Sequence, residues 1–162
     1  MNIRQLEKLS KQSLIELIVQ MTKMSKVNKT FLESQITADY ESLLTVCRKD
    51  LQKAFVSFDK LSLRDARKAL ADFQKANPPQ HLFVELCIYY IHLAYELEEI
   101  DWRFGESFFS AIEKVYEMIF RAFASDSSLI EAYLPAIMEL KNQANEGWGH
   151  RDYLEERLED YS

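Results

Sequence analysis

Glycine and proline, the residues that most often interrupt a helix, occur at only five places in this chain. These places are Pro78–Pro79, Gly105, Pro135, Gly147 and Gly149. Between them, apolar residues recur every three or four positions, which places them on one face of an α-helix. Inside a helix, glycine costs about 1 kcal/mol and proline about 3 kcal/mol relative to alanine, so their scarcity favours helix throughout. The sequence therefore predicts an all-α protein.

The spacing of apolar residues and caps predicts seven to eight helices with short connections, mostly antiparallel to their neighbours. We expect them at 11–36, from 37–39 to Phe55, from Ser62 to Pro78, at 80–100, at 106–124, from Ser128 to Gly147, and at 150–161. Ser128 and Glu131 fit a capping box, and Pro135 is expected to kink or divide the helix that follows.

Residues 80–100 are apolar on nearly all sides, which is typical of a central helix. With the short connections, this favours a curved two-layer stack of helix hairpins over a closed four-helix bundle or an irregular helical bundle. At 162 residues we expect one domain, 1–162, with residues 1–10 as a loosely attached N-terminal segment.

Composition argues against several classes of protein. The net charge of −6 disfavours nucleic-acid binding, and no apolar run is long enough for a transmembrane helix. The first residues lack the apolar stretch of a signal peptide. The two cysteines, Cys47 and Cys87, are too far apart in the sequence to form a CxxC pair. They are expected in the core of a protein in a reducing compartment. We therefore expect a cytoplasmic protein that contacts neither nucleic acid nor membrane.

Charge is unevenly distributed along the chain. Residues 1–80 hold 14 Lys and Arg against 9 Asp and Glu, whereas residues 81–162 hold 6 against 17. Ordinary solvated faces account for such a pattern, since surface charge rarely encodes a partner. The alternative is a dipolar molecule that associates head to tail or binds a basic partner on its C-terminal half.

Arg64, Arg67 and Lys68 share one face of a predicted helix. Arginine presents a planar fork of donors that suits carboxylate or phosphate, so this face is a candidate anion site. The alternative is a solvated face on which Lys68 and Asp72 form an ordinary ion pair.

Trp148 stands between two glycines, which allow a tight turn that aims the indole in one direction. An outward indole would bind a partner, whereas an inward one would fill the gap between the last two helices. We expect the inward orientation. His150 follows directly and is either a binding residue or a cap of the last helix.

His81–Glu85 and His92–Glu96 are each spaced four residues apart on the 80–100 helix, which can place two ligands on one cation. No other predicted helix offers a matching set, and a solvent-facing polar stripe has the same pattern. No metal and no cofactor is predicted, and these four residues are only weak metal candidates.

Two segments resemble a known family: the run from Leu63 to Lys75, and Gly147 to Asp152. A third, commoner segment is the serine-capped helix from Leu9 to Ile18. Together they are similar to a family of small uncharacterised bacterial helical proteins, known only as a domain of unknown function. The resemblance implies a bacterial cytosolic protein of one domain, and it supplies no activity or catalytic residue.

The function predicted from these patterns is a non-catalytic helical module that binds a protein or peptide, with no catalytic residue assigned. The alternatives are a small-anion-binding protein or enzyme that uses Arg64, Arg67 and Lys68, and a metal-binding helical protein. Trp148 and His150 are further candidate binding residues, and homo-oligomerisation is left open.

Overall fold

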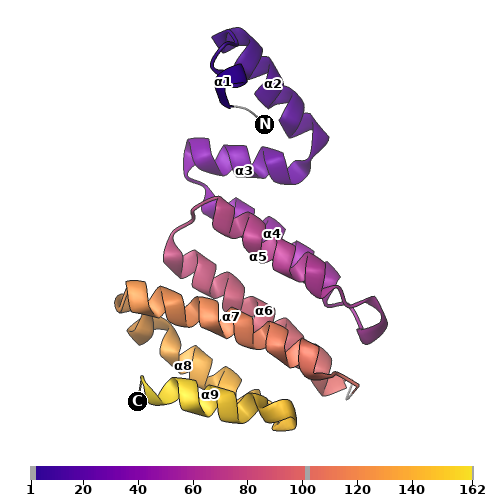
Figure 1. Ribbon diagram of the computed structural model, residues 1–162, viewed down its shortest axis with the longest axis vertical. Coiled ribbons are helices and arrows are strands. Elements are labelled where there is room, and N and C mark those ends of the chain that lie inside the picture. The colour runs from indigo at the N-terminus through magenta and orange to yellow at the C-terminus, as the bar shows by residue number, and fades with distance from the viewer. Residues whose placement is uncertain (1–2, 101–102, 162) are drawn as a thin grey trace. The chain divides into compact units, whose positions relative to one another are not determined.

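The computed structural model describes residues 3–100 and 103–161, without the side chains of residues 99 and 100, and it is all-α. The described residues contain nine α-helices and no strand (Figure 1). These are α1 (Ile3–Leu6), α2 (Lys11–Met24), α3 (Lys26–Thr37), α4 (Tyr40–Ala54), α5 (Leu63–Lys75), α6 (Gln80–Ile100), α7 (Glu106–Ser125), α8 (Ser128–Gln143) and α9 (His150–Glu159). Short 3-10 turns lie at Phe58–Lys60 and Gly147–Gly149. No helix of the described residues has both the length and the apolar character needed to cross a membrane.

Contacts divide the chain into two compact units, Met1–Val46 and Cys47–Ser162. We call them the N-terminal unit and the C-terminal unit and describe each by itself. The expected single domain and the curved two-layer stack stay predictions.

The N-terminal unit shows that the helix expected over 11–36 was wrong, because two helices cover this stretch. Ser25 adopts an extended conformation (φ −151°, ψ 129°) between α2 and α3, and its hydroxyl accepts a hydrogen bond from the amide of Asn28 at 3.4 Å. A serine in this conformation starts a new helix by satisfying a free amide. Ser10 caps α2 in the same way, as its position predicts.

Two helix starts in the remainder of the chain depend on acidic or hydroxyl side chains. Ser62 accepts from the amide of Asp65 at 3.3 Å, which confirms the predicted start of α5. The capping box expected at Ser128 was wrong: Ser128 is already the first residue of α8, and its amide is bonded by the carboxylate of Asp126 at 3.0 Å. The first amide of α8 therefore donates to Asp126, two residues earlier, and not to a serine side chain.

The prolines behave in two ways. α5 ends at Lys75, before Pro78–Pro79, and Asn77 has left the right-handed helical region with φ 51°. This agrees with the restriction that a proline places on the residue before it. Pro135, in contrast, lies inside α8, which continues from Ser128 to Gln143 and is not divided.

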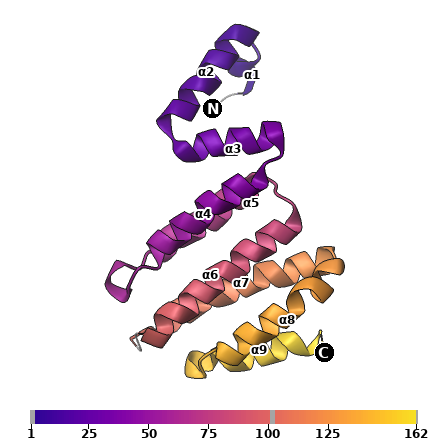
Figure 2. The same cartoon turned by 180° about the vertical axis from the view of Figure 1, so that it is seen from behind.

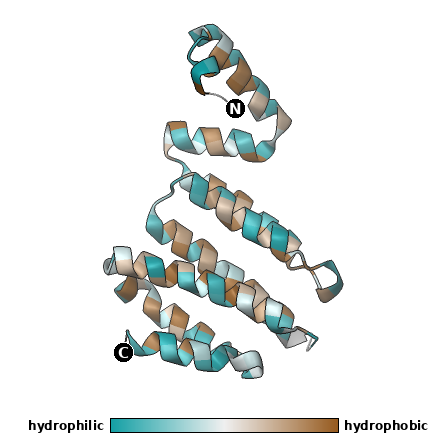
Figure 3. Cartoon of the chain, in the orientation of Figure 1, coloured by the Kyte–Doolittle hydropathy of each residue, from teal (hydrophilic) through white to brown (hydrophobic). Residues whose placement is uncertain are grey.

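The core of the C-terminal unit is built around α6, which packs against α5, α7 and α8. Figures 1 and 2 show α7 running alongside α6, with α8 and α9 side by side. Val84, Leu86, Cys87, Tyr90, Ile91 and Ala94 of α6 are fully buried. The central position predicted for the 80–100 helix is confirmed. α9 is mostly hydrophilic in Figure 3 and buries only His150, Leu154 and Leu158.

Both cysteines are free and buried, Cys47 on α4 and Cys87 on α6. Burial raises the pKa of the Cys47 thiol to about 12, and burial also raises that of Cys87. Both side chains act as small apolar groups of the core, as the sequence predicts.

The central position of α6 predicts a large cost for truncating its inward side chains. Leu86 is 0% exposed, and Leu86→Ala should lower the free energy of unfolding by about 2–5 kcal/mol through lost burial and a residual cavity. His81→Ala, at an exposed position of the same helix, should change it by less than about 0.5 kcal/mol. Urea unfolding followed by circular dichroism measures both, and similar values for the two variants would contradict the central role of α6.

Candidate functional site

A groove lies between α6 and α8, with one end formed by Arg48 of α4, and its volume is about 410 Å³. We call it the α6–α8 groove. Its apolar walls come from Ile88 on α6 and from Ala136 and Leu140 on α8. All of its lining residues belong to the C-terminal unit.

One end of the groove is polar and centres on Glu85. Arg48 Nη2 donates to Glu85 Oε2 at 3.2 Å, and the Tyr133 hydroxyl donates to Glu85 Oε1 at 3.1 Å. Burial and the neighbouring Glu85 carboxylate raise the pKa of Tyr133 to about 12, so the phenol stays protonated and can donate. Both oxygens of Glu85 are thus engaged within the protein.

At this polar end, the Nε of Arg48 is a buried donor without a partner among the described residues. Its guanidinium lies 5.6 Å from the centre of the Tyr89 ring, which fixes its orientation. Its Nε is buried, and no acceptor for it is found among the described residues. A buried N–H without a partner costs about 1–3 kcal/mol. Because this Nε is closed to solvent, a ligand oxygen could accept from it only after the Arg48 side chain moves.

Two of the four weak metal candidates line this groove, but they form no metal site. Glu85 is held by Arg48 and Tyr133, whereas His92 lies 3.5 Å from Glu96 in an exposed pair. His81 is exposed. In the part of the chain that the structure describes, no three His, Cys, Asp or Glu side chains come together to hold a metal ion.

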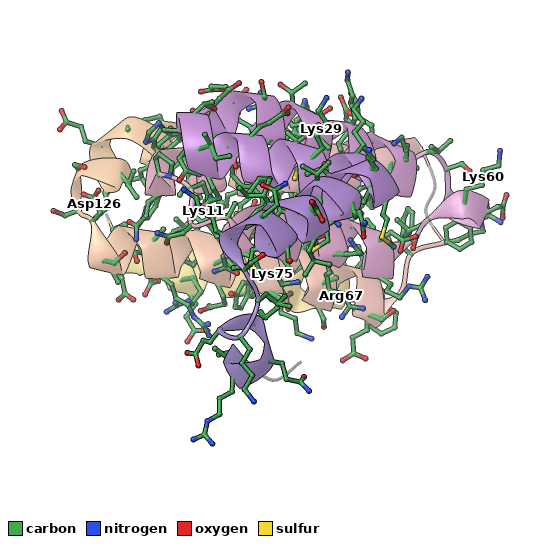
Figure 4. The ribbon with its side chains drawn as sticks, turned by 90° about the horizontal axis from the view of Figure 1, so that it is seen from above. Lys11, Lys29, Lys60, Arg67, Lys75 and Asp126 are labelled. Carbon is green, nitrogen blue, oxygen red and sulfur yellow. The ribbon has the colours of Figure 1, made fainter. Side chains whose placement is uncertain are left out.

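The three cations of the predicted anion face on α5 are separated. Lys68 is paired with Asp72, and Arg64, with its side chain 89% exposed, lies 3.5 Å from Asp65. Arg67 lines a cavity of about 420 Å³ together with Ser107, Ser110 and Lys114 of α7. Figure 4 labels Arg67 and Lys75, which both come from α5, and Lys75 also pairs with Asp72 at 3.2 Å.

Trp148 points outward, so the inward orientation expected for it was wrong. Its side chain is 64% exposed, and its backbone is left-handed at φ 59°. The preceding turn is fixed by Asn145, whose side chain accepts from the amide of Gly147 at 2.8 Å and donates to Glu98 at 2.8 Å. The next residue to face inward is His150, which is 0% exposed.

His150 joins three helices through a buried chain of hydrogen bonds. Its Nδ1 lies 3.1 Å from Glu113 Oε1, and its Nε2 lies 2.8 Å from the Tyr95 hydroxyl, which is 3.2 Å from the Tyr116 hydroxyl. A carboxylate only accepts, so Nδ1 carries the proton and Nε2 accepts from Tyr95. Tyr116 then donates to Tyr95, and every member is satisfied with a neutral imidazole. His150 is therefore neither an exposed binding residue nor only a cap.

The order tyrosine–histidine–carboxylate is one that activates nucleophiles in enzymes. Here Tyr95 is 5% exposed and His150 is 0% exposed, and burial raises the pKa of Tyr95. The hydroxyl is closed to a substrate and is not activated as a base or nucleophile. The hydrogen bonds among Glu113, His150, Tyr95 and Tyr116 therefore hold α6, α7 and α9 together.

Sequence reasoning named Glu85 and His150 but missed their partners. Arg48, Tyr133, Tyr95 and Glu113 lie between 37 and 55 residues from the groups they bond. No local pattern marks such pairings, because they depend on which helices pack together. The one available signal is that tyrosine and arginine on an apolar helix face usually find a polar partner.

No protein-family model, no curated protein and no solved structure was found to match this chain. The resemblance to a family of uncharacterised bacterial helical proteins stays a prediction. The functional argument therefore depends on the geometry above.

The buried imidazole predicts a pH dependence of stability. Burial lowers the pKa of His150 below its ordinary value, against the opposing effect of Glu113. The unfolded chain then takes up a proton at a higher pH than the folded chain does. Stability is complete above the unfolded pKa of about 6.5 and is lost as pH falls through the folded pKa, by at most about 1.4 kcal/mol per pH unit.

We expect this group to lower the free energy of unfolding as the pH falls from about 7.5 to about 5.5. His150→Gln should remove that contribution, whereas His81→Gln, at an exposed site on α6, should retain it. Urea unfolding at both pH values measures the difference, and NMR titration of the wild-type imidazole reports its pKa even if the variant does not fold. A pKa at or above 6.5 would contradict the neutral assignment.

Proposed function

We propose that this protein is a non-catalytic helical module that binds a peptide segment of a protein partner in the α6–α8 groove. The observation that carries the proposal is the open groove of about 410 Å³, with apolar walls and with Arg48, Glu85 and Tyr133 at its polar end. A cytoplasmic location belongs to this proposal and is supported by the two free buried cysteines. Bacterial origin rests on the resemblance alone.

The chemistry of the groove selects its occupant. Ile88, Ala136 and Leu140 would contact one large apolar side chain, and a polar group of the same segment would lie at the polar end of the groove. Glu85 and Glu139 outnumber the single cation Arg48 along the groove. A neutral or basic peptide is therefore favoured over an acidic one, which suits the negative balance of residues 81–162.

The proposed module is non-catalytic because its one tyrosine–histidine–carboxylate arrangement among the described residues is closed to a substrate. The only tyrosine–histidine–carboxylate chain found in the described residues is buried and packed between helices. Peptide binding, in contrast, needs only an open apolar surface with a few placed polar groups, which the groove supplies.

Filling the groove should abolish peptide binding. We would select peptides from a displayed random library on the wild-type protein and measure their affinity by fluorescence polarisation. Ala136→Phe places a ring in the groove and should weaken the selected peptides at least about tenfold. Selected peptides should share a large apolar residue beside Lys or Arg.

Ala132→Phe is the matched control, because Ala132 is exposed on the same helix and does not line the groove. It should leave the affinity unchanged. Failure to enrich any peptide, or an equal loss in both variants, would contradict the proposal.

A second candidate function, small-anion binding, is favoured by the cavity beside Arg67. Arg67 and Lys114 supply two cationic groups, and Ser107 and Ser110 supply two hydroxyl donors, which together suit a phosphate or carboxylate. Glu106 also lines the cavity and opposes a highly charged anion. We infer that any such ligand is a small monoanion held chiefly by Arg67.

Calorimetric titration with inorganic phosphate at low salt tests this second function. Arg67→Gln should reduce the affinity about tenfold or more, because it removes a charged donor from the cavity. Arg64→Gln removes the same charge from an exposed position of the same helix, and it should have little effect. Absence of heat, or equal losses in the two variants, would leave the anion hypothesis without support.

A further inference from the structure

We propose that the exposed apolar face of α2 binds the same face of α2 in a second copy of this chain. This surface belongs to the N-terminal unit, whereas the residues that line the α6–α8 groove belong to the C-terminal unit. The inference therefore goes beyond the proposed function and does not rest on it.

The apolar face of α2 is much wider than one neighbour requires. At about 100° per residue, its apolar side chains occupy an arc of roughly 220°. The opposite arc carries the polar residues Gln12, Glu16, Gln20 and Lys23. Within the N-terminal unit α2 packs against α3. One helical neighbour covers only part of such an arc, since a stripe little more than about 100° wide suffices to face a core.

The exposure of these side chains confirms that the arc is incompletely covered. None of the residues of α2 is buried. The exposed fractions are 44% for Ile15, 37% for Leu17, 41% for Ile18, 44% for Val19, 50% for Met21 and 84% for Met24. Figure 3 shows the hydrophobic colour along α2. In α7, by comparison, ten residues are buried.

The exposed area is of the size that a dimer needs. Together the exposed apolar side chains of α2 present a surface of roughly 600 Å², at the upper end of the largest patch on a typical monomer. Each partner of a standard protein interface buries about 800 Å². The α2 face therefore supplies most of one side of such an interface.

Charge favours a second copy over a charged partner. Residues 1–46 hold six Lys and Arg against five Asp and Glu, a net charge of +1. Glu16 and Lys23 lie on the polar arc, whereas Lys11, the first residue of α2, lies within the apolar arc. In an antiparallel pair the two Lys11 side chains lie at opposite ends of the contact, so two copies can meet without bringing like charges together. Such a pairing is closed by a two-fold axis, the commonest symmetry of homo-oligomers.

Two-fold pairing of antiparallel α2 helices places Ile18 near the symmetry axis, because it lies at the middle of Lys11–Met24. Ile18→Glu would therefore bring two carboxylates together in an apolar contact. Ile18→Cys would place two thiols where they can be joined. The native thiols of Cys47 and Cys87 are buried and do not interfere.

Sedimentation equilibrium of the full chain tests the proposal. We expect the wild type to dimerise reversibly and Ile18→Glu to raise the dissociation constant at least about a hundredfold. Met138→Glu is the matched control, since Met138 is 39% exposed on α8 against 41% for Ile18, and it should leave the dissociation constant unchanged. Circular dichroism confirms that both variants keep their helices.

Cross-linking gives a second readout that does not need a destabilising charge. Ile18→Cys should form a disulfide-linked dimer under mild oxidation, and Met138→Cys should not. A wild type that stays monomeric at every accessible concentration, or a dimer that Ile18→Glu leaves intact, would overturn the proposal. Peptide binding in the α6–α8 groove is unaffected by Ile18→Glu, so failure of one proposal is distinguishable from failure of the other.

Discussion

The burial of α6 against α5, α7 and α8 is the interaction on which the rest of the C-terminal unit depends. A helix with apolar side chains on nearly all sides leaves water only by acquiring neighbours on several sides, and each neighbour is amphipathic enough to face solvent with its other side. Both the α6–α8 groove and the buried histidine chain follow from this packing. The groove lies between α6 and α8, and the histidine chain joins α9 to α6 and α7.

Polar groups in this unit are of two kinds. Tyr95, Tyr116 and His150 satisfy one another in the interior and specify how α6, α7 and α9 fit together. Arg48, in contrast, keeps a buried donor without an acceptor in the described chain. The satisfied groups hold the helices together, whereas the unpaired Arg48 donor departs from the usual satisfaction of buried polar groups.

The all-α class, the central helix and most helix ends could be predicted from the sequence, because they depend on local spacing and on caps such as Ser10 and Ser62. The break at Ser25 was missed because a serine inside an apolar repeat has the same local pattern whether it caps a helix or continues one. The orientation of Trp148 could not be predicted either, since it depends on a turn that Asn145 holds by a hydrogen bond to the distant Glu98. The cavity that Arg67 lines beside α7 could not be predicted, because a helix face alone does not show what packs beside it.

The two buried thiols have a consequence for the dynamics of the core. Only the thiolate reacts with alkylating reagents, and the raised pKa of Cys47 and Cys87 makes it scarce while the helices are closed. Alkylation therefore requires local opening, so the alkylation rate of each thiol reports how often its own helix, α4 or α6, opens. Equal rates would mean that the interior opens as one cooperative body, and unequal rates would show which helix loosens first.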